Sequence, residues 1–245
     1  LEAQVNQLQL GDYFICANEK QLDLWIGMLS TLNKVNPEEV SKSSKLSRLI
    51  DIVPFGISEQ EPVKTRQDAI LEKIPNYKEG DKVILWGGGV WNWFDPLTCI
   101  RAVAKISKER EDLKLFFMGI KHPNPEIPEM EMTLKAIKLA EELGVKDKYV
   151  FFNEDWVEYN DRQNFILDCY AGVSCHFNTL ETRYSFRTRV LDYLWARLPI
   201  LCTEGDYFAD LVQREGLGIV VPYEDSDKMA EAMLRLMEDK QFYES

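Results

Sequence analysis

Residues 181–198 concentrate the side chains that could bind an anion. Four of the chain's 11 arginines lie there, although acidic residues outnumber lysine and arginine by 41 to 29 overall. They are Arg183, Arg187, Arg189 and Arg197. A guanidinium group holds phosphate through two parallel hydrogen bonds, and free amides at a helix start add to its grip. This local reversal of charge predicts a site for an anionic ligand, although a salt-bridged helix face would have the same composition.

A helix that began near Ser185 would give this segment two faces. Its apolar face would pack on a sheet through Val190, Leu191, Leu194 and Leu198. Ser185, Arg189 and Asp192 would share the other face. A carboxylate in a nucleotide site commonly accepts hydrogen bonds from the two hydroxyls of a ribose. We therefore expect Ser185, Arg189 and Asp192 to contact a nucleotide.

Three consecutive glycines form the second candidate. Gly87, Gly88 and Gly89 follow an apolar run and precede a helix start at Asp95. Without Cβ atoms, their backbone can turn tightly and approach a phosphate or a sugar closely. The spacing is neither Gly-x-Gly-x-x-Gly nor a Walker sequence, and residues 88–95 contain no cation. The glycines therefore predict either a ligand-binding turn or a plain tight turn.

Aromatic and histidine side chains lie in segments that follow apolar runs. Trp156 could stack on a nucleobase, although an aromatic side chain at this place could equally pack against the protein. His122 lies in a proline-rich loop, and His176 lies five residues before Glu181. We expect Trp156 to bind nucleotide, and for both histidines an ordinary structural role remains the alternative.

Positioning these residues requires a sheet whose strands end near one another. From residue 81 onward, short apolar runs alternate with segments that have apolar residues every three or four positions. The runs predict strands over residues 82–86, 114–118, 149–153, 171–176, 199–203 and 218–221. The periodic segments predict helices over residues 96–107, 130–143, 162–169, 186–196, 207–215 and 226–239. This alternation predicts an α/β fold with a Rossmann-like doubly wound parallel sheet, which binds ligands at the carboxyl ends of its strands.

The first 75 residues have a different pattern. Residues 1–10 and 18–33 are expected to be helical, and residues 13–17 and 49–53 are expected to be strands. So few elements do not close a core of their own. We therefore interpret residues 1–75 as the remnant of a preceding domain with a linker, and residues 76–245 as the ligand-binding domain. Since the chain does not begin with Met, we expect it to be part of a longer protein.

Composition argues against several classes of function. The net charge of −12 opposes binding to nucleic acid or to anionic lipid over most of the surface. No apolar run approaches the length of a membrane span, so we expect no transmembrane segment. The five cysteines are widely spaced in apolar segments, which is typical of reduced residues in a cytoplasmic protein. Neither histidine has a partner at metal-ligand spacing, so we expect no metal site.

Residues 80–240 resemble the C-terminal domain of retaining family 4 (group 1) glycosyltransferases with the GT-B fold. The most specific part is residues 180–205, where Ala196-Arg197-Leu198-Pro199-Ile200 stands in place of the family's Ala-Gly-x-Pro-Val. Residues 217–221 resemble the Gly-rich late strand of the family. Upstream, residues 52–57 resemble the Val-Pro-Asn-Gly-Val segment at which the chain crosses between two domains.

The resemblance implies transfer of a sugar from a nucleoside diphosphate donor, without a cofactor or a catalytic metal. The family has two acids separated by seven residues, the first contacting the donor sugar and the second the ribose. Alignment on Pro199 assigns Asp192 to the second acid, while Glu181 lies three residues too early for the first. We expect Glu181, Arg183 and Arg187 to be the catalytic residues, with the arginines of this segment replacing the cation that is missing near the glycines.

The resemblance also implies a carbohydrate or lipid-linked acceptor that binds through the N-terminal domain, of which residues 1–75 would be a remnant. We therefore expect this chain alone to bind nucleotide weakly and to transfer no sugar. The full-length protein is expected to act in the cytoplasm, at the inner membrane face. Two alternatives remain, namely a sugar epimerase on the same fold and a nucleotide-sugar-binding module without catalysis, for which the missing cation is the best argument.

Overall fold

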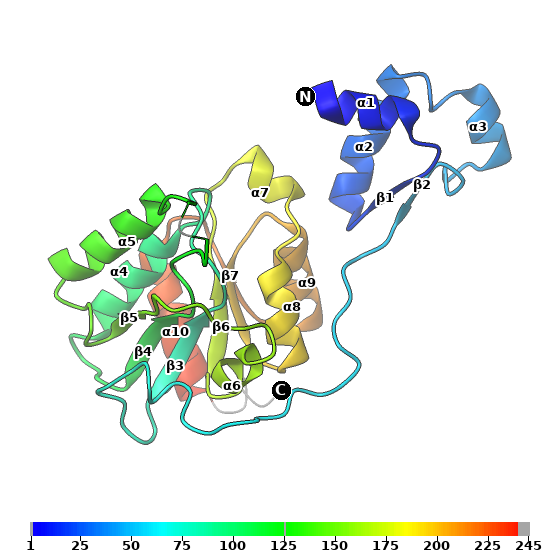
Figure 1. The fold of residues 1–245 in the computed structure, drawn as a ribbon. Helices are drawn as coiled ribbons and strands as arrows, with labels where there is room; N and C mark the ends of the chain where they lie inside the picture. Colours follow the sequence, from blue (N-terminus) through cyan, green and yellow to red (C-terminus); the bar gives the residue numbers. More distant parts are fainter. Residues whose placement is uncertain (1, 125, 240–245) are drawn as a thin grey trace.

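The computed structural model describes residues 2–124 and 126–239, which fold into a smaller N-terminal unit and a larger C-terminal unit (Figure 1). Residues 53–81, which lack helices and strands, connect the two and run along the larger unit. We call this segment the connector. All the site residues expected from the sequence lie in the larger unit.

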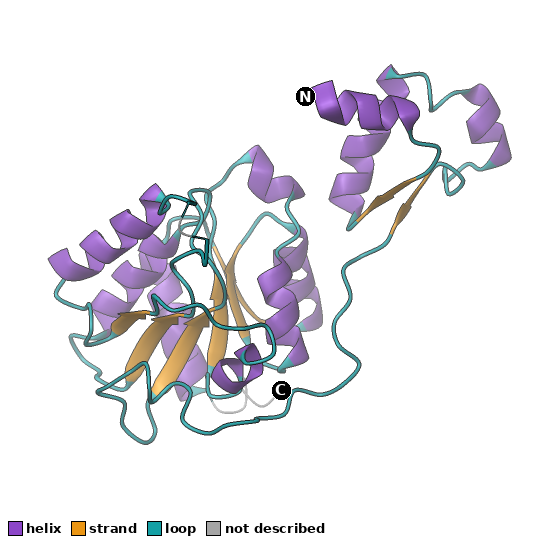
Figure 2. Cartoon of the chain, viewed as in Figure 1, coloured by secondary structure: helices purple, strands orange, loops and turns teal. Residues whose placement is uncertain are grey.

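Over residues 82–124 and 126–239, six parallel strands form one sheet in the order β5-β4-β3-β6-β7-β8 (Figure 2). The strands are β3 (Lys82–Trp86), β4 (Leu113–Phe117), β5 (Val150–Phe152), β6 (Ala171–Ser174), β7 (Ile200–Thr203) and β8 (Gly218–Val221). Along the chain, β3, β4 and β5 follow one another from the centre of the sheet to one edge, and β6, β7 and β8 follow one another from the centre to the other edge. The winding direction therefore changes between β3 and β6, which confirms the doubly wound parallel sheet.

Helices cover both faces of the sheet (Figures 1 and 2). One face packs against α4 (Pro96–Ile106), α5 (Glu131–Glu142) and α10 (Ser226–Glu238). The other packs against α6 (Arg162–Ile166), α8 (Thr188–Trp195) and α9 (Tyr207–Glu215). Three of these helices begin at an aspartate that accepts a backbone N–H, namely Asp95, Asp206 and Asp225. Local capping signals therefore fix where loops give way to helices at the carboxyl edge of the sheet.

The smaller unit contains α1 (Glu2–Leu10), β1 (Phe14–Cys16), α2 (Glu19–Thr31), α3 (Pro37–Lys42) and β2 (Ile50–Ile52). Its strands pair in parallel, and an apolar cluster that includes Leu29 and Ile50 holds the helices against them. The sequence analysis did not predict α3, because six residues are too few to show an apolar repeat. Its start is nevertheless marked by Asn36, which caps the helix, and by Pro37.

The connector and α2 both contact the larger unit. Ala69, Ile70 and Ile74 of the connector are buried in the apolar core on the face of the sheet that also packs against α6, α8 and α9. In α2, the Nε2 atom of Gln21 donates to the backbone oxygen of Tyr184 at 2.8 Å. The packing of the larger unit therefore includes residues that precede position 76.

The arginine-bearing segment contains two helices, of which the second corresponds to the helix predicted over residues 186–196 and the first was not predicted. The first, α7 (Leu180–Tyr184), begins after the capping side chain of Thr179. The backbone is extended at Ser185, and α8 begins at Thr188. The predicted helix start near Ser185 is wrong, because Phe186 and Arg187 turn inward between the helices. The Phe186 ring packs on α9, and Arg187 is buried.

A close approach between α8 and the sheet occurs at the change of winding. The ring of Tyr193, from α8, lies against Gly172 of β6. A Cβ atom on Gly172 would lie 2.4 Å from that ring, far inside van der Waals contact. The helix can pack at this depth because residue 172 has no side chain.

Neither a long apolar helix nor a metal-binding cluster occurs in the described residues. None of the helices within residues 2–124 and 126–239 is long and apolar enough to cross a bilayer. Over the same residues, no group of three His, Cys, Asp or Glu side chains could hold a metal ion. The five cysteines are free thiols, and all are buried.

Replacement of Gly172 by alanine is expected to lower the free energy of unfolding by about 1–3 kcal/mol, the usual cost of overpacking a core. Urea titration measures this change. Gly119→Ala is the control, because a Cβ there meets nothing within 4 Å; it should change the stability by less than about 0.5 kcal/mol. Equal stability of Gly172→Ala and the wild type would contradict the close approach.

Candidate functional site

A cavity of about 530 Å³ lies at the carboxyl ends of β3 and β6. We call it the first cavity. Its walls are the glycine turn at residues 87–89, α7, the start of α8 and connector residues 55–58. Gly88 has a φ of +92°, a backbone conformation that glycine adopts far more readily than other residues. Ser185 also lines the cavity. The sheet edge at which the fold predicts a ligand is therefore hollow.

Arg189 reaches the glycine turn from α8. Its Nη2 atom donates to the backbone oxygen of Gly89 at 2.9 Å. The guanidinium group lies 4.2 Å from the ring centroid of Phe94 and 4.8 Å from that of Trp86. These are cation–π contacts with two aromatic faces, and they hold the group beside the cavity.

The charge of Arg189 has no acidic counterpart. Among the described residues, no carboxylate forms an ion pair with it, and its buried Nη1 atom has no hydrogen-bond partner. Burial lowers the pKa of Arg189 to about 10, so the group stays charged at neutral pH. The cavity wall therefore carries a positive charge that the surrounding protein leaves uncompensated.

Arg187 borders the same cavity but is paired inside the protein. Its Nε atom lies 2.6 Å from Oδ2 of Asp206, and both side chains are almost inaccessible to solvent. One guanidinium nitrogen also donates to the backbone oxygen of Ser174 at 3.3 Å. Burial lowers the pKa of Arg187, and the Asp206 carboxylate opposes this shift. The charge of Arg187 is thus already balanced, in contrast to that of Arg189.

Asp192 lines the cavity beside Arg162 of α6. Nε of Arg162 lies 3.0 Å from Oδ1 of Asp192. The guanidinium group itself lies 3.6 Å from the ring centroid of Tyr159 and 4.6 Å from that of Trp195. Because 33% of the Asp192 side chain is exposed, its carboxylate can accept further hydrogen bonds from a ligand. Arg162 thus fixes the direction of a carboxylate that remains available.

Of the remaining charged candidates, one lines the first cavity and two lie outside it. Glu181, in the first turn of α7, lines the cavity. Arg183, expected to be a catalytic cation, is exposed on the same short helix and is not part of the cavity lining. Arg197 is also exposed and pairs with Glu61 of the connector. Arg183 lies on α7 and Arg197 lies beyond the C-terminal end of α8, so neither joins Arg187 and Arg189 at the cavity.

A second cavity, of about 650 Å³, adjoins the first and shares Gly88, Gly89 and Arg162 with it. Trp156 and His122 line this second cavity, with their ring centroids 6.4 Å apart. Trp156 is 55% exposed, so its ring is not packed inside the core. Trp156 therefore lies beside the arginine-lined cavity and offers an aromatic face to a planar group.

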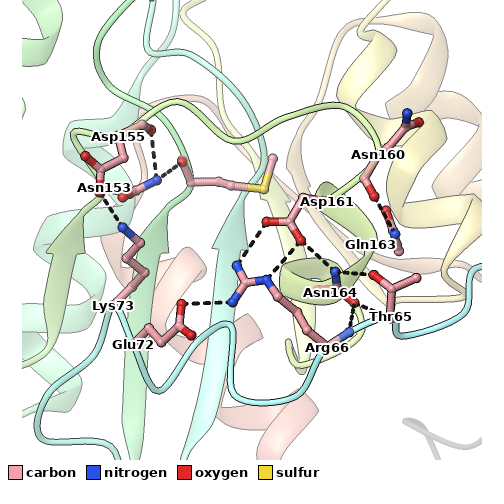
Figure 3. Close-up of polar contacts among 11 residues, drawn as sticks. Thr65, Arg66, Glu72, Lys73, Asn153, Asp155, Asn160, Asp161, Gln163 and Asn164 are labelled. Atoms are coloured by element: carbon pink, nitrogen blue, oxygen red, sulfur yellow. Dashed lines mark hydrogen bonds and ion pairs between the residues drawn. The ribbon is translucent and has the colours of Figure 1, made fainter.

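The connector holds the loop that carries Trp156, residues 153–161 (Figure 3). At one end of the loop, Arg66 donates to both carboxylate oxygens of Asp161, at 3.0 and 2.9 Å. At the other end, Lys73 pairs with Asp155. Two-point contact of this kind fixes an arginine and a carboxylate in one plane.

Side-chain amides tie the same loop to the body of the unit (Figure 3). The fully buried Asn164 accepts a hydrogen bond from the backbone N–H of Thr65 at 2.7 Å and donates to Asp161 at 2.7 Å. Asn153 donates to the backbone oxygen of Met118 at 2.8 Å. The wall of the second cavity is therefore fixed at both ends by buried or half-buried polar contacts.

His176 lies at the carboxyl end of β6, 1% exposed, and its ring packs edge-on against Phe94 with centroids 4.8 Å apart. Neither ring nitrogen has a hydrogen-bond partner within the described part of the chain. Burial, together with the charges of Arg187 and Arg189, holds the pKa of His176 well below its ordinary value. The imidazole is therefore neutral, and it lines the first cavity.

The sequence analysis missed Arg162 as a cavity residue, and it recognised residues 52–57 as a crossing segment without expecting residues 55–58 to line the site. A signal for Arg162 was present. Arg162 follows the loop after β5, and that loop begins at the carboxyl edge of the sheet, where the glycine turn also lies. A basic residue at such a position is a candidate for phosphate or carboxylate contact.

Residues 81–239, well over half of the chain, match the protein family described as "Glycosyl transferases group 1". The chain belongs to the group 1 glycosyl transferases. No curated protein sequence matches it. The family places the hollow sheet edge, the glycine turn and the arginines in a glycosyl transferase domain.

Solved glycosyltransferases of the GT-B type share this glycosyl transferase's α/β fold. WaaG, a glycosyltransferase involved in lipopolysaccharide biosynthesis, is 19% identical with a TM-score of 0.65, covering 93% of this chain and 54% of that one. Anabaena Alr3699/HepE, solved with UDP and glucose, is 12% identical with a TM-score of 0.73, covering 98% and 58%. The C-terminal domain of LpcC from Francisella tularensis is 14% identical with a TM-score of 0.57, covering 74% and 87%. The chain spans about half the length of WaaG and HepE.

Replacement of His176 by phenylalanine is expected to change how the stability of the domain depends on pH. Unfolded His176 takes up a proton near pH 6.5, whereas the folded residue does not. Proton uptake by the unfolded state alone lowers the free energy of unfolding as the pH falls below about 6.5. Between about pH 7.5 and 5.5, the wild type should lose about 1.4 kcal/mol more than His176→Phe. Urea titrations at these pH values measure the difference, and parallel curves would contradict the neutral imidazole.

Proposed function

We propose that this glycosyl transferase domain binds a nucleoside diphosphate sugar as donor. The diphosphate is proposed to bind in the first cavity, between the glycine turn and Arg189. The nucleobase then extends into the second cavity, against Trp156. The sugar is passed to a carbohydrate or lipid-linked acceptor, and the protein's own cations neutralise the diphosphate in place of a metal or other cofactor.

The observation that carries this proposal is the uncompensated charge of Arg189. A partly buried guanidinium group without an acid loses hydration, which in Arg189 one backbone oxygen and two aromatic rings replace only in part. An anionic ligand in the first cavity restores that compensation through charge-assisted hydrogen bonds. Because Arg189 contacts Gly89, it supplies a cation to the turn whose own residues 88–95 contain none. The fold neighbour HepE was solved with UDP and glucose, which supports a ligand of this class.

The acids on the cavity wall suit the two ends of the donor. Asp192, oriented by Arg162, is proposed to accept the ribose hydroxyls. Glu181 is proposed to contact the donor sugar from α7. The position of Asp192 ahead of Pro199 supports a further assignment within group 1, to the retaining family 4.

In the proposed reaction, the oxygen of an acceptor hydroxyl bonds to the anomeric carbon and releases its proton, while the bond between the anomeric carbon and the diphosphate oxygen breaks and negative charge grows on the leaving diphosphate. Arg189 is fixed by its two aromatic contacts and by Gly89. The start of α8, at Thr188 and Arg189, also lines the cavity, and the first N–H groups of a helix have no partners within the helix itself. Donors that are already in place stabilise the developing charge without reorganisation, which is the usual source of such catalysis.

The acceptor is proposed to approach from the side of the smaller unit. Connector residues 55–58 line the first cavity there, and the ring of Phe55 packs on that of Phe186 with centroids 5.3 Å apart. Phe55 and Ile57 are 59% and 53% exposed, so they offer apolar surface beside the proposed sugar. Flat apolar groups next to a sugar-binding cavity can contact the faces of a carbohydrate acceptor.

Replacing Arg189 with methionine is expected to weaken nucleoside diphosphate binding by about tenfold or more, because a hydrogen bond to a charged group contributes roughly 1.5–3 kcal/mol. Calorimetric titration of the wild type with UDP, GDP and dTDP identifies the nucleotide, and the variant is titrated with the same one.

Arg197→Met is the matched control, because Arg197 is exposed and lies outside the cavity lining. It should leave the affinity unchanged. Failure of the wild type to bind any of the three nucleotides would refute the proposed function. Binding that is unaffected by Arg189→Met would refute the role of this arginine alone. Consumption of the nucleotide sugar only when an acceptor is present would distinguish transfer from binding without catalysis.

Trp156→Ala is expected to weaken the binding of nucleoside diphosphate and of the corresponding nucleoside to the same extent. Stacking of a base on an aromatic ring contributes about 1–3 kcal/mol. Inorganic pyrophosphate lacks a base, so its affinity should not change. A loss of pyrophosphate binding in Trp156→Ala would place the ring near the phosphates and contradict the assignment of the second cavity.

A further inference from the structure

We propose that Tyr193 is a positioning residue for donor binding, whose buried hydroxyl holds the glycine turn in the shape that receives the diphosphate. The inference rests on the proposed function, because it concerns the same cavity. It does not follow from that function, since Tyr193 is 0% exposed and lies outside the cavity lining.

The hydroxyl group of Tyr193 lies among the backbone groups at the ends of β3 and β6. Its oxygen accepts a hydrogen bond from the backbone N–H of Gly87 at 2.8 Å. It also lies 3.0 Å from the backbone oxygens of Leu85 and of Val173, to which it donates its one proton. A single phenol thus joins the first residue of the glycine turn to both strands.

This position has a structural cause in the change of winding. β3 pairs with β4 over its full length, but its register with β6 consists of Ile84 and Leu85. Beyond Leu85 the two strands separate, and the cavity opens there. Separation leaves backbone groups facing the gap, and buried backbone groups without partners are costly. The Tyr193 hydroxyl supplies partners for these groups, so the cavity can open without orphaned N–H and C=O groups.

The hydroxyl reaches this point because the ring passes over a glycine. A Cβ atom on Gly172 would lie 2.4 Å from the ring. A Cβ atom on Gly87 would lie 3.2 Å from the ring and its hydroxyl, so the turn itself also fits closely around this side chain. The two glycines and the tyrosine therefore form one packed unit.

The same helix holds both ends of the turn. Tyr193 contacts Gly87, and Arg189, one helical turn earlier in α8, contacts the backbone oxygen of Gly89. Side chains four residues apart on a helix lie on the same face. Gly88, between them, has a positive φ and no side chain to fix it. The shape of the turn is thus set from α8, and loss of either contact leaves one end of the turn free.

The test is Tyr193→Phe, which keeps the ring over Gly172 and removes the hydroxyl. Its affinity for the nucleoside diphosphate that binds the wild type most tightly among UDP, GDP and dTDP is expected to fall about five- to tenfold, the effect of a neutral hydrogen bond. Its affinity for the corresponding nucleoside should not change, because the turn contacts the phosphates. If Tyr193 had a merely structural role, the affinity for both ligands would fall or neither affinity would change.

Tyr170→Phe is the matched control. The hydroxyl of Tyr170 donates to the backbone oxygen of Leu236 at 2.6 Å, away from the cavity lining. This variant also loses a hydrogen bond of a part-buried tyrosine, and it should bind the nucleoside diphosphate as the wild type does. Thermal unfolding of both variants shows whether each is folded.

A double-mutant cycle with Arg189→Met provides the second readout. If both side chains act through the same turn, their effects on affinity should not add, and the double variant should bind much more tightly than the product of the two losses predicts. Should Tyr193→Phe not fold, Gly87→Ala is the second variant, because its Cβ atom would crowd the same contact from the side of the turn. It should also weaken binding of the nucleoside diphosphate and leave binding of the nucleoside unchanged.

The outcomes separate the two proposals. Binding of the nucleoside diphosphate by the wild type with unchanged affinity in Tyr193→Phe overturns this inference and leaves the proposed function in place. An equal loss for nucleoside and nucleoside diphosphate also overturns it. Absence of binding by the wild type overturns both.

Discussion

The buried ion pair between Arg187 and Asp206 determines how the rest of the site is arranged. Removing two charges from water is costly, and the close approach of the two groups, at 2.6 Å, offsets part of that cost. Arg187 is the residue before α8, and Asp206 caps α9. The pair therefore fixes where α8 begins and how it is rotated. From that start, Arg189 points toward the first cavity and Asp192 toward the Arg162 guanidinium group. Tyr193 points toward the end of β3.

The same energetic rule explains the contrast between two arginines in one short segment. Arg187 has an acid, so its charge is compensated within the fold. Arg189 has aromatic faces and a backbone oxygen in place of an acid, so part of its electrostatic potential is directed into the cavity. The first cavity thus combines a rigid support with an unbalanced charge, which is the arrangement expected where a ligand completes the electrostatics.

The sheet and most helices could be predicted from the sequence because they depend on local and periodic signals. The strand predicted over residues 82–86 coincides with β3, and the helix predicted over residues 207–215 coincides with α9. The division into α7 and α8 could not be predicted, because it depends on the tertiary burial of Phe186 and Arg187. The contact between Tyr193 and Gly172 joins elements that are far apart in the chain, and no spacing rule in one sequence reveals it. The roles of Glu181, Arg189, Asp192 and Trp156 stay predictions, although the structure shows which cavity each one lines.

The connector has a consequence for where the larger unit ends. In its residues 64–74, Arg66 and Lys73 pair with both ends of the loop at residues 153–161, and three buried apolar side chains form part of the core on one face of the sheet. The packed core of the larger unit therefore includes a stretch of chain that has no regular secondary structure. A truncation made at β3 would remove the residues that hold the loop at residues 153–161, together with part of the core. These non-local contacts therefore place the boundary of the larger unit upstream of β3.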